Sequence, residues 1–237
     1  MLTVDLKALG LKDGERLLDL GCGAGRHLHN AYYKAKIEAF GLDRSLPDVL
    51  KTRDGFAAYP DMTPGAECRF RLLVGDCLAL PFPEASFDTI ICSEVLEHLP
   101  RYEIALAEMA RILKPGGKLA VSVPRFWPEW ICWRLATGYH TVPGGHVRIF
   151  KPAVLQGAIE RAGFQFQRRH YAHGLHSPYW WLQCLVWARR ESDPLVKAYH
   201  RFLVWDIMRR PWLTRVLSRI ADPLMGKSLV LYFRKEA

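Results

Sequence analysis

The chain has 237 residues, half of them hydrophobic, so residues 1–237 suffice for a single α/β domain with a large core. Six scattered cysteines without Cys-x-x-Cys pairs argue against a disulfide framework or a structural zinc site. The net charge is +9, no apolar run approaches the roughly 20 residues of a membrane-spanning helix, and no signal peptide is recognisable, so we expect a cytoplasmic protein.

Strands and helices are predicted to alternate through the first half of the chain. Short apolar runs predict strands at 16–22, 37–43, 70–76, 87–94 and 118–124. The segments between them predict helices at about 25–36, 46–57 and 101–113, the last ending in a Lys-Pro-Gly-Gly turn at 114–117. Apolar strands between helices imply a parallel sheet covered on both faces, with ligands at the carboxyl ends of its strands.

The second half is predicted to complete this sheet and to carry two additions. A helix is expected at 151–164, and strands at 164–172 and 227–235. Residues 125–150 are expected to form a lid over an acceptor site. Residues 173–226 are too long for a turn and predict a helical insertion, in which Asp193 caps a helix whose apolar face is Val196, Tyr199, Leu203 and Ile207.

The positive charge and the tryptophans are confined to the second half. Residues 1–124 hold 15 Lys and Arg against 17 Asp and Glu, whereas residues 125–237 hold 18 against 7 together with all eight tryptophans. A basic surface suits either nucleic acid or the inner face of a membrane. Because the Trp ring prefers the bilayer interface, we expect peripheral membrane contact through 125–145 and 178–215. The alternative is that these tryptophans fill the core.

Three glycines follow the first predicted strand: Gly21, Gly23 and Gly25. Such a turn brings backbone N–H groups close to a ligand, although dinucleotide-binding folds also use glycine there and a plain structural turn stays open. Acidic residues refine the prediction. Asp43 and Asp76 end the second and third strands, where carboxylates can bind ribose hydroxyls and an adenine amino group. Asp19 can orient the turn or a ligand ammonium group.

These motifs resemble those of the class I S-adenosylmethionine-dependent methyltransferases. The matching stretches are "LLDLGCGAG" (17–25), "GLD" (41–43), "GDCLALPFPEASFD" (75–88), "EVLEHL" (94–99) and "RILKPGGKLAVSVP" (111–124). The resemblance spans about residues 10–170. It implies a Rossmann-like, seven-stranded, mostly parallel sheet with an antiparallel last strand and helices on both faces.

The same resemblance implies where S-adenosylmethionine binds. The three glycines would accommodate its amino-acid portion, Asp43 its ribose, and Asp76 with the Cys77 backbone its adenine. The predicted cofactor site also includes four residues next to these positions: Asp19, Cys22, Arg44 and Ser93.

A closer resemblance is to the O-methyltransferases of ubiquinone biosynthesis, through "EVLEHLP", "HVRIFKPAVL" and "RRHYAHGLHSP". That family reaches polyprenyl phenols at the membrane with an aromatic, basic segment after the fifth strand. It links a Glu-x-x-Glu-His arrangement to a divalent metal, and Glu94, Glu97 and His98 match by position. Many methyltransferases carry "EVLEH" without a metal, so we predict no metal site. His98 and His146 are the predicted catalytic residues.

The leading interpretation is an enzyme that methylates a small lipophilic acceptor, at oxygen, at the membrane surface. One alternative is an RNA methyltransferase, motivated by the basic second half. It is less favoured because the Asn/Asp-Pro-Pro-Tyr/Phe motif of base amino-group methylation is missing. Another alternative is a non-catalytic, membrane-docked protein that binds S-adenosylmethionine. The sequence predicts neither the acceptor nor the oligomeric state.

Overall fold

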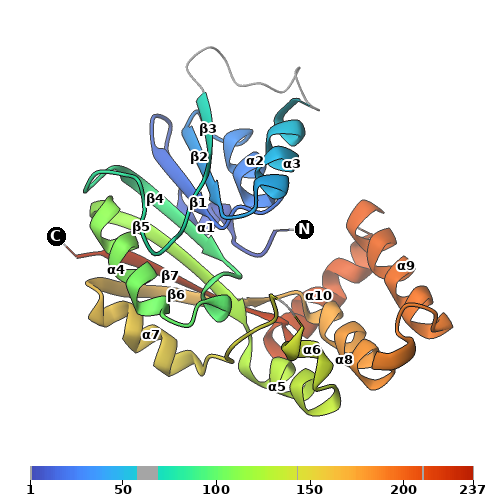
Figure 1. Cartoon of the computed structure of the whole chain (residues 1–237). Helices are drawn as coiled ribbons and strands as arrows, with labels where there is room; N and C mark the ends of the chain where they lie inside the picture. The colour runs from blue at the N-terminus through green and yellow to red at the C-terminus, as the bar shows by residue number, and fades with distance from the viewer. Residues whose placement is uncertain (1, 58–68, 143, 210, 237) are drawn as a thin grey trace.

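A seven-stranded sheet in the order β3-β2-β1-β4-β5-β7-β6 forms the centre of the molecule (Figure 1). The computed structural model describes residues 2–57, 69–142, 144–209 and 211–236, so Cys68, Pro143 and Arg210 lie outside the described residues. The strands are β1 (Arg16–Leu20), β2 (Glu38–Asp43), β3 (Arg69–Val74), β4 (Phe87–Ser93), β5 (Leu113–Pro124), β6 (Phe164–Ala172) and β7 (Ser228–Lys235). β1 to β5 run parallel and β7 runs antiparallel to β5 and β6, which confirms the predicted Rossmann-like sheet.

Helices cover both faces of the sheet. Because side chains alternate along a strand, Leu17 and Leu18 of β1 enter two different cores. Leu17 packs with α1 (Leu6–Leu9), α2 (Arg26–Tyr32) and α3 (Leu46–Ala57). On the other face, Leu18 packs with α4 (Tyr102–Ile112) and α7 (Pro152–Arg161) (Figure 1).

One predicted boundary is wrong. The Lys-Pro-Gly-Gly segment at 114–117 does not form a turn between helix and strand, because β5 already begins at Leu113. Its pairing with β4 shifts register between Phe87 and Thr89, and Gly116 absorbs the irregularity with a φ of +71°. Lys114 Nζ also holds Asp88 of β4 at 2.7 Å, which ties the segment to the neighbouring strand.

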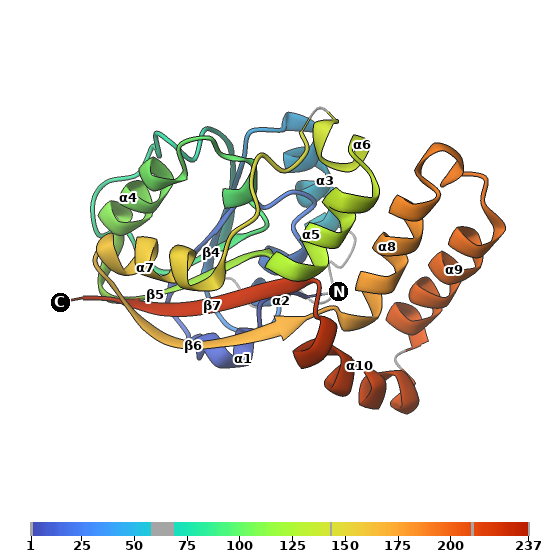
Figure 2. The ribbon, with the colours of Figure 1, turned by 90° about the horizontal axis from the view of Figure 1, so that it is seen from below.

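The remaining helices lie beyond the carboxyl ends of the parallel strands (Figure 2). They are η2 (Leu96–His98), α5 (Phe126–Leu135), α6 (Gly138–Thr141), η3 (Gly174–His176), α8 (Ser177–Leu185), η4 (Trp187–Arg189), α9 (Pro194–Arg209) and α10 (Trp212–Met225). Asp193 caps α9 as predicted, with Oδ1 accepting from the amides of Leu195 at 3.0 Å and Val196 at 3.2 Å. Within the described ranges, no helix has the length and the apolar character needed to cross a bilayer.

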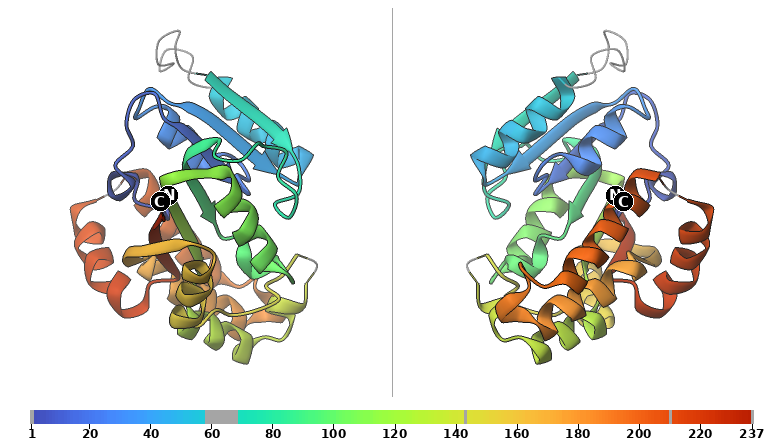
Figure 3. Two further views of the ribbon diagram at one scale, coloured as in Figure 1. Left: turned by 90° about the vertical axis from the view of Figure 1, so that its left-hand side faces the viewer. Right: turned by 90° about the vertical axis from the view of Figure 1, so that its right-hand side faces the viewer.

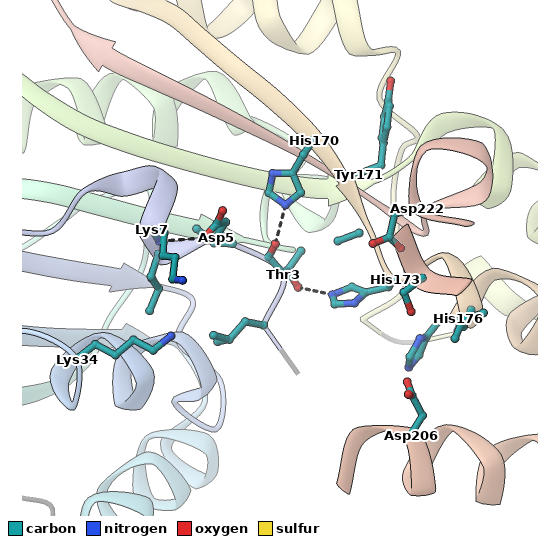
Figure 4. A pocket seen from close by; sticks show the side chains of 16 residues that line it. Thr3, Asp5, Lys7, Lys34, His170, Tyr171, His173, His176, Asp206 and Asp222 are labelled. Atoms are coloured by element: carbon teal, nitrogen blue, oxygen red, sulfur yellow. Dashed lines mark hydrogen bonds between the residues drawn. The ribbon is translucent and has the colours of Figure 1, made fainter. Parts of the chain in front are cut away.

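Histidines hold the N-terminal segment against this end of the sheet. His27 Nε2 accepts from the amides of Thr3 and Val4, both at 3.2 Å. His170 Nε2 contacts the Thr3 carbonyl at 3.2 Å, and His173 Nε2 contacts the Thr3 hydroxyl at 3.0 Å (Figure 4). The segment lines a cavity of about 390 Å³. Since a ring nitrogen accepts only when it carries no proton, His27 must be neutral in the folded protein.

The hydrogen bonds that His27 accepts from Thr3 and Val4 predict a loss of stability in acid. Burial, with help from the charge of Arg26, lowers the pKa of His27 from 6.5 to about 3. Below pH 6.5 the unfolded chain therefore binds a proton that the folded chain does not, so stability falls as the pH falls toward 3. We expect His27 alone to remove about 2 kcal/mol of unfolding free energy between pH 7 and pH 5.

Urea unfolding at the two pH values tests this expectation. His27→Gln should lose about 2 kcal/mol less than the wild type between pH 7 and pH 5. The exposed His200 of α9 provides the control, and His200→Gln should keep the full pH dependence. An identical pH dependence in His27→Gln and the wild type would show that protonation of His27 is not the source of the acid sensitivity.

Candidate active site

The glycine loop and Asp43 form one hydrogen-bonded unit at the ends of β1 and β2. The amides of Gly21 and Cys22 donate to the carbonyl of Leu42, at 2.8 and 3.1 Å. The Gly23 amide donates to Asp43 Oδ2 at 2.9 Å, and the Ser45 amide donates to Asp43 Oδ1 at 2.9 Å. Asp43 thus fixes the loop, and its half-exposed carboxylate keeps lone pairs available for a ligand.

The three glycines of the loop have different reasons to be glycine. All have positive φ, at +71° for Gly21, +53° for Gly23 and +77° for Gly25. A Cβ on Gly21 would lie 2.3 Å from Val95 Cγ2, and one on Gly25 would lie 2.7 Å from both His29 and Thr52. A Cβ on Gly23 would meet nothing within 4 Å. Gly23 therefore faces open space, where a ligand can approach the backbone.

This difference predicts unequal costs for two alanine substitutions. Gly23→Ala should lower the unfolding free energy by about 1–2 kcal/mol, since only the left-handed backbone opposes it. Gly21→Ala adds a clash with Val95 and should lower it by about 3 kcal/mol or more. Urea unfolding of the two variants measures both costs, and equal losses would contradict this account of the loop.

The other predicted cofactor residues divide between the interior and the mouth of this site. Asp19 is buried below the loop, where Oδ2 accepts from the Leu28 amide of α2 at 3.1 Å and burial raises its pKa to about 7. The Cys22 thiol is also buried, and burial raises its pKa to about 12. The buried Ser93 hydroxyl contacts that of Ser122 at 2.8 Å. These three buried side chains therefore belong to the interior beneath the site and not to its accessible surface.

The predicted cofactor residues nearer the surface, Arg44, Asp76 and Cys77, follow the ends of β2 and β3. Asp76 is exposed, and its Oδ1 accepts from the Leu78 amide at 2.9 Å. Burial raises the pKa of the neighbouring Cys77 thiol to about 11, although the charge of Arg44 acts against this rise. Arg44, Cys77 and Asp76 therefore share one region next to Asp43. Their assignment to the cofactor stays a prediction.

A second cluster of hydrogen-bonded side chains surrounds Glu129 of α5, and no sequence motif indicated it. Glu129 is fully buried, and its two oxygens face four donors: Trp133 Nε1 at 3.2 Å, Tyr139 Oη at 3.2 Å, His146 Nδ1 at 2.6 Å and Lys227 Nζ. Burial alone would raise the pKa of Glu129, but the hydrogen bond from His146 and the charge of Lys227 outweigh it and lower the pKa to about 2. Conversely, burial acts to lower the pKa of Lys227, but the Glu129 carboxylate raises it overall. The pair is ionised.

The Glu129 carboxylate determines the tautomer of His146. An ionised carboxylate only accepts hydrogen bonds, so the proton of neutral His146 is on Nδ1 and Nε2 carries a lone pair. His146 lines a cavity of about 430 Å³ beside the glycine loop. Its walls include Arg26 at the start of α2, Glu94 after β4, and the aromatic side chains of Tyr139, Trp180 and Trp187. The cavity thus combines an oriented imidazole with walls that are partly aromatic and partly charged.

The metal ligands suggested by the family resemblance are rearranged. Glu94 has a φ of +57°, and its Oε1 accepts from Ser122 Oγ at 3.0 Å. Among the described residues, the group able to hold a cation is instead Glu97, His98 and His146, with one donor atom of each within 4.8 Å of the others. Glu97 is fully buried, and neither carboxyl oxygen has a hydrogen-bond partner among the described residues. Burial, reinforced by Glu94, raises its pKa well above the usual range.

The two predicted catalytic histidines lie together. The rings of His98 and His146 are 4.9 Å apart between centroids. His98 Nδ1 contacts the Gly145 carbonyl at 3.3 Å, and burial, with the nearby His146, lowers the pKa of His98. No sequence motif indicates that Glu129 contacts His146 or that Lys227 contacts Glu129. Glu129 stands in a Trp-rich helix and Lys227 precedes the last strand, about 100 residues away.

Two curated relatives resemble part of this chain. A ubiquinone biosynthesis O-methyltransferase of Xanthomonas euvesicatoria is 32% identical over 165 residues, which are 65% of this chain and 64% of that protein. A demethylmenaquinone methyltransferase of Renibacterium salmoninarum is 38% identical over 130 residues, which are 54% of this chain and 49% of that protein. The chain thus spans less than two thirds of the length of either relative.

A solved structure shows the fold of this chain, and a family model shows its family. The phosphoethanolamine N-methyltransferase 2 of Haemonchus contortus, in complex with S-adenosyl-L-methionine, superposes with a TM-score of 0.59 and 16% identity, over 98% of this chain and 51% of that one. This likeness shows the fold. Residues 4–168, more than half of the chain, match the family described as a methyltransferase domain. The chain therefore belongs to the S-adenosylmethionine-dependent methyltransferase family.

Proposed function

We propose that this protein transfers a methyl group from S-adenosylmethionine to an oxygen atom of a small lipophilic acceptor at a membrane surface. The observation that carries the proposal is the position of His146. It is held by the buried Glu129 and lines an aromatic cavity next to the glycine loop. The names of the two curated relatives, which concern quinone-type compounds, support an acceptor of this chemical class.

The cofactor arrives already activated, since its sulfonium group makes the methyl group a good electrophile. The protein must align the acceptor with the S–CH₃ bond and exclude water. Asp43 and the glycine loop fix one end of this arrangement. We infer that residues 125–150, with α5 and α6, cover the other end as a lid. Cys132 and Ala136 of this segment pack against Cys184, Trp180 and Trp181 of α8.

His146 is assigned the proton transfer. In the neutral tautomer, Nε2 can accept the proton of an acceptor hydroxyl as its oxygen attacks the methyl group. Glu129 then stabilises the resulting imidazolium through its contact with Nδ1, and Lys227 keeps Glu129 ionised. The apolar rings of Trp180 and Trp187 favour a phenol or another lipophilic alcohol over a charged acceptor.

A divalent cation is a second candidate at this position, favoured by the buried carboxyl of Glu97, which accepts no hydrogen bond from the described residues and lies 4.0 Å from His98 Nε2. Glu97, His98 and His146 offer the oxygen and nitrogen donors that such cations take, and Glu129 would orient His146 from behind. A bound cation would act as a Lewis acid that lowers the pKa of the acceptor hydroxyl. At His146 Nε2 this role excludes the role of base.

Chelation separates these two roles. The base assignment predicts that EDTA leaves the rate of methyl transfer unchanged within about twofold, and that His98→Ala keeps most of the activity. If EDTA abolishes the activity and Mg²⁺ or Mn²⁺ restores it, a bound cation and not His146 activates the acceptor hydroxyl. Binding of S-adenosylhomocysteine, measured in parallel, controls for damage to the cofactor site.

The proposed function itself is tested by following the methyl group. The purified protein is incubated with methyl-labelled S-adenosylmethionine and either a membrane-lipid extract or total RNA. We expect label in the organic phase of the lipid reaction only. Label in RNA would establish the RNA methyltransferase instead. Cofactor binding without any transfer would favour a non-catalytic protein.

A further inference from the structure

The helix α10 shows the reverse of the usual amphipathic arrangement. Its inward side consists of Thr214, Ser218, Ala221, Asp222 and Met225, of which only Met225 is a large apolar residue. Its outward side consists of large apolar residues, namely Trp212, Leu213, Val216, Leu217, Ile220 and Leu224, each at least 41% exposed. At 3.6 residues per turn this apolar side covers an arc of roughly 140°. A surface helix of a water-soluble domain normally buries such a stripe.

The orientation of α10 is fixed by specific contacts on its polar side. Asp222 Oδ1 accepts from the Gly174 amide of η3 at 2.7 Å, and Gly174 has no room for a Cβ because Ala221 would lie 2.5 Å away. Ser177 of α8 donates to the Met225 carbonyl at 2.6 Å. Arg125 donates to the Pro223 carbonyl at 3.0 Å. The helix therefore cannot turn its apolar side inward without losing these bonds.

The charges of α10 complement an anionic surface. Arg215 and Arg219 are exposed, and the helical period places both along one edge of the apolar side. Asp222, the one carboxylate in the sequence of α10, points inward to Gly174. The exposed side therefore combines apolar side chains with positive charge and no negative charge. This combination is typical of helices that lie in the interface of an anionic bilayer.

One exposed tryptophan, Trp212, belongs to the same surface. Five of the eight, Trp127, Trp133, Trp180, Trp181 and Trp187, are half-buried, and most of them pack between α5 and α8, so the core-filling alternative applies to these. Trp130, Trp205 and Trp212 are exposed, and Trp212, at 69%, is the most exposed of the three. Trp212 opens α10, where an amphipathic ring suits the headgroup level. The helix α10 lies at the outer edge of the molecule, away from α4 (Figure 3).

We propose that the apolar side of α10 is the membrane-docking surface of this protein, with Arg215 and Arg219 contacting anionic headgroups. A second copy of the chain fits this surface less well, because pairing two such helices brings four arginines together without an acidic side chain between them. Nucleic acid would leave the apolar side in water. The purpose of docking rests on the proposed function. Lys227, two residues after α10 ends, lines the catalytic cavity, so the bilayer would lie close to the acceptor site.

Flotation with lipid vesicles tests the surface. The full-length protein, without cofactor or acceptor, is mixed with vesicles of phosphatidylcholine alone or with phosphatidylglycerol. We expect flotation with the anionic vesicles at low salt and a smaller bound fraction at high salt. Ile220→Glu should lower the bound fraction at least tenfold. The matched control is Val154→Glu on α7, which adds the same charge at a similar exposure, 55% against 57%, and should float like the wild type.

The outcomes separate this inference from the proposed function. Circular dichroism and S-adenosylhomocysteine binding should be unchanged in Ile220→Glu, so a folding defect is recognised. Wild-type protein that does not float, or Ile220→Glu that floats normally, overturns the inference whatever the enzymatic result. A dimer in size-exclusion chromatography that Ile220→Glu dissociates also overturns it, in favour of self-association. Flotation without methyl transfer contradicts the proposed function alone.

Discussion

Asp43→Ala should lower the affinity for S-adenosylhomocysteine by about 2–3 kcal/mol, equivalent to roughly 30- to 150-fold. The carboxylate carries two functions in the structure. It accepts from the amides of Gly23 and Ser45, which holds the glycine loop in place, and its remaining lone pairs face the position proposed for the ribose. Removing it therefore loses the ligand contacts and loosens the loop that the ligand needs. Calorimetric titration measures the change directly.

Two further variants separate these contributions. Asp43→Asn keeps the size of the side chain and one acceptor oxygen but removes the charge, so it should lose part of the affinity and retain most of the loop. Asp54→Ala, at an exposed acid of α3, controls for the change in net charge and should bind normally. Unchanged affinity in Asp43→Ala would exclude this carboxylate from the cofactor site.

Glu129→Gln should reduce kcat by about 10²- to 10⁴-fold while leaving S-adenosylhomocysteine affinity unchanged. The amide keeps the shape of the carboxylate but no longer stabilises an imidazolium at His146, and it no longer ensures the tautomer with the proton on Nδ1. It also leaves the buried Lys227 without its counter-charge, so the unfolding free energy should fall by about 3–5 kcal/mol. Steady-state kinetics and urea unfolding measure the two effects.

The matched control is Glu191→Gln, since the Glu191 side chain is 89% exposed and its ion pair is with Arg190 and not with Glu129, His146 or Lys227. It should keep wild-type kinetics and stability. Because Glu129 acts through His146, the double variant with His146→Ala should be no slower than His146→Ala alone. If the rate loss in the double variant equals the product of the two single losses, Glu129 and His146 act independently, contrary to the proposal.

The geometry of the glycine loop and of the acidic strand ends was predictable because the sequence signals for them are local. A strand, a glycine turn and an acidic strand end are each a few residues long, and the order of the strands brings them to one edge of the sheet. The sequence left two roles open for Asp19, which were orientation of the turn and contact with a ligand ammonium group. In the structure Asp19 is buried under the loop, whereas Asp43 is half-exposed at the end of β2.

The acceptor half was only partly predictable because its contacts join distant segments. His98 and His146 were found through motifs, but the partner of His146 is a glutamate in a helix that otherwise looks hydrophobic and aromatic. Lys227 contacts Glu129 although the whole insertion lies between them in the sequence. The reversed orientation of α10 was equally hidden, since a helical period shows two faces and not which one meets the protein.

Methyl transfer to a lipophilic acceptor can be followed by mass spectrometry of lipids from cells that express the protein. Cells with the wild type are compared with cells that express equal amounts of Glu129→Gln. We expect a lipid that is heavier by one CH₂ unit, with label from methyl-labelled methionine, in the wild-type cells only. Identical lipid masses and labelling in the two extracts would contradict it.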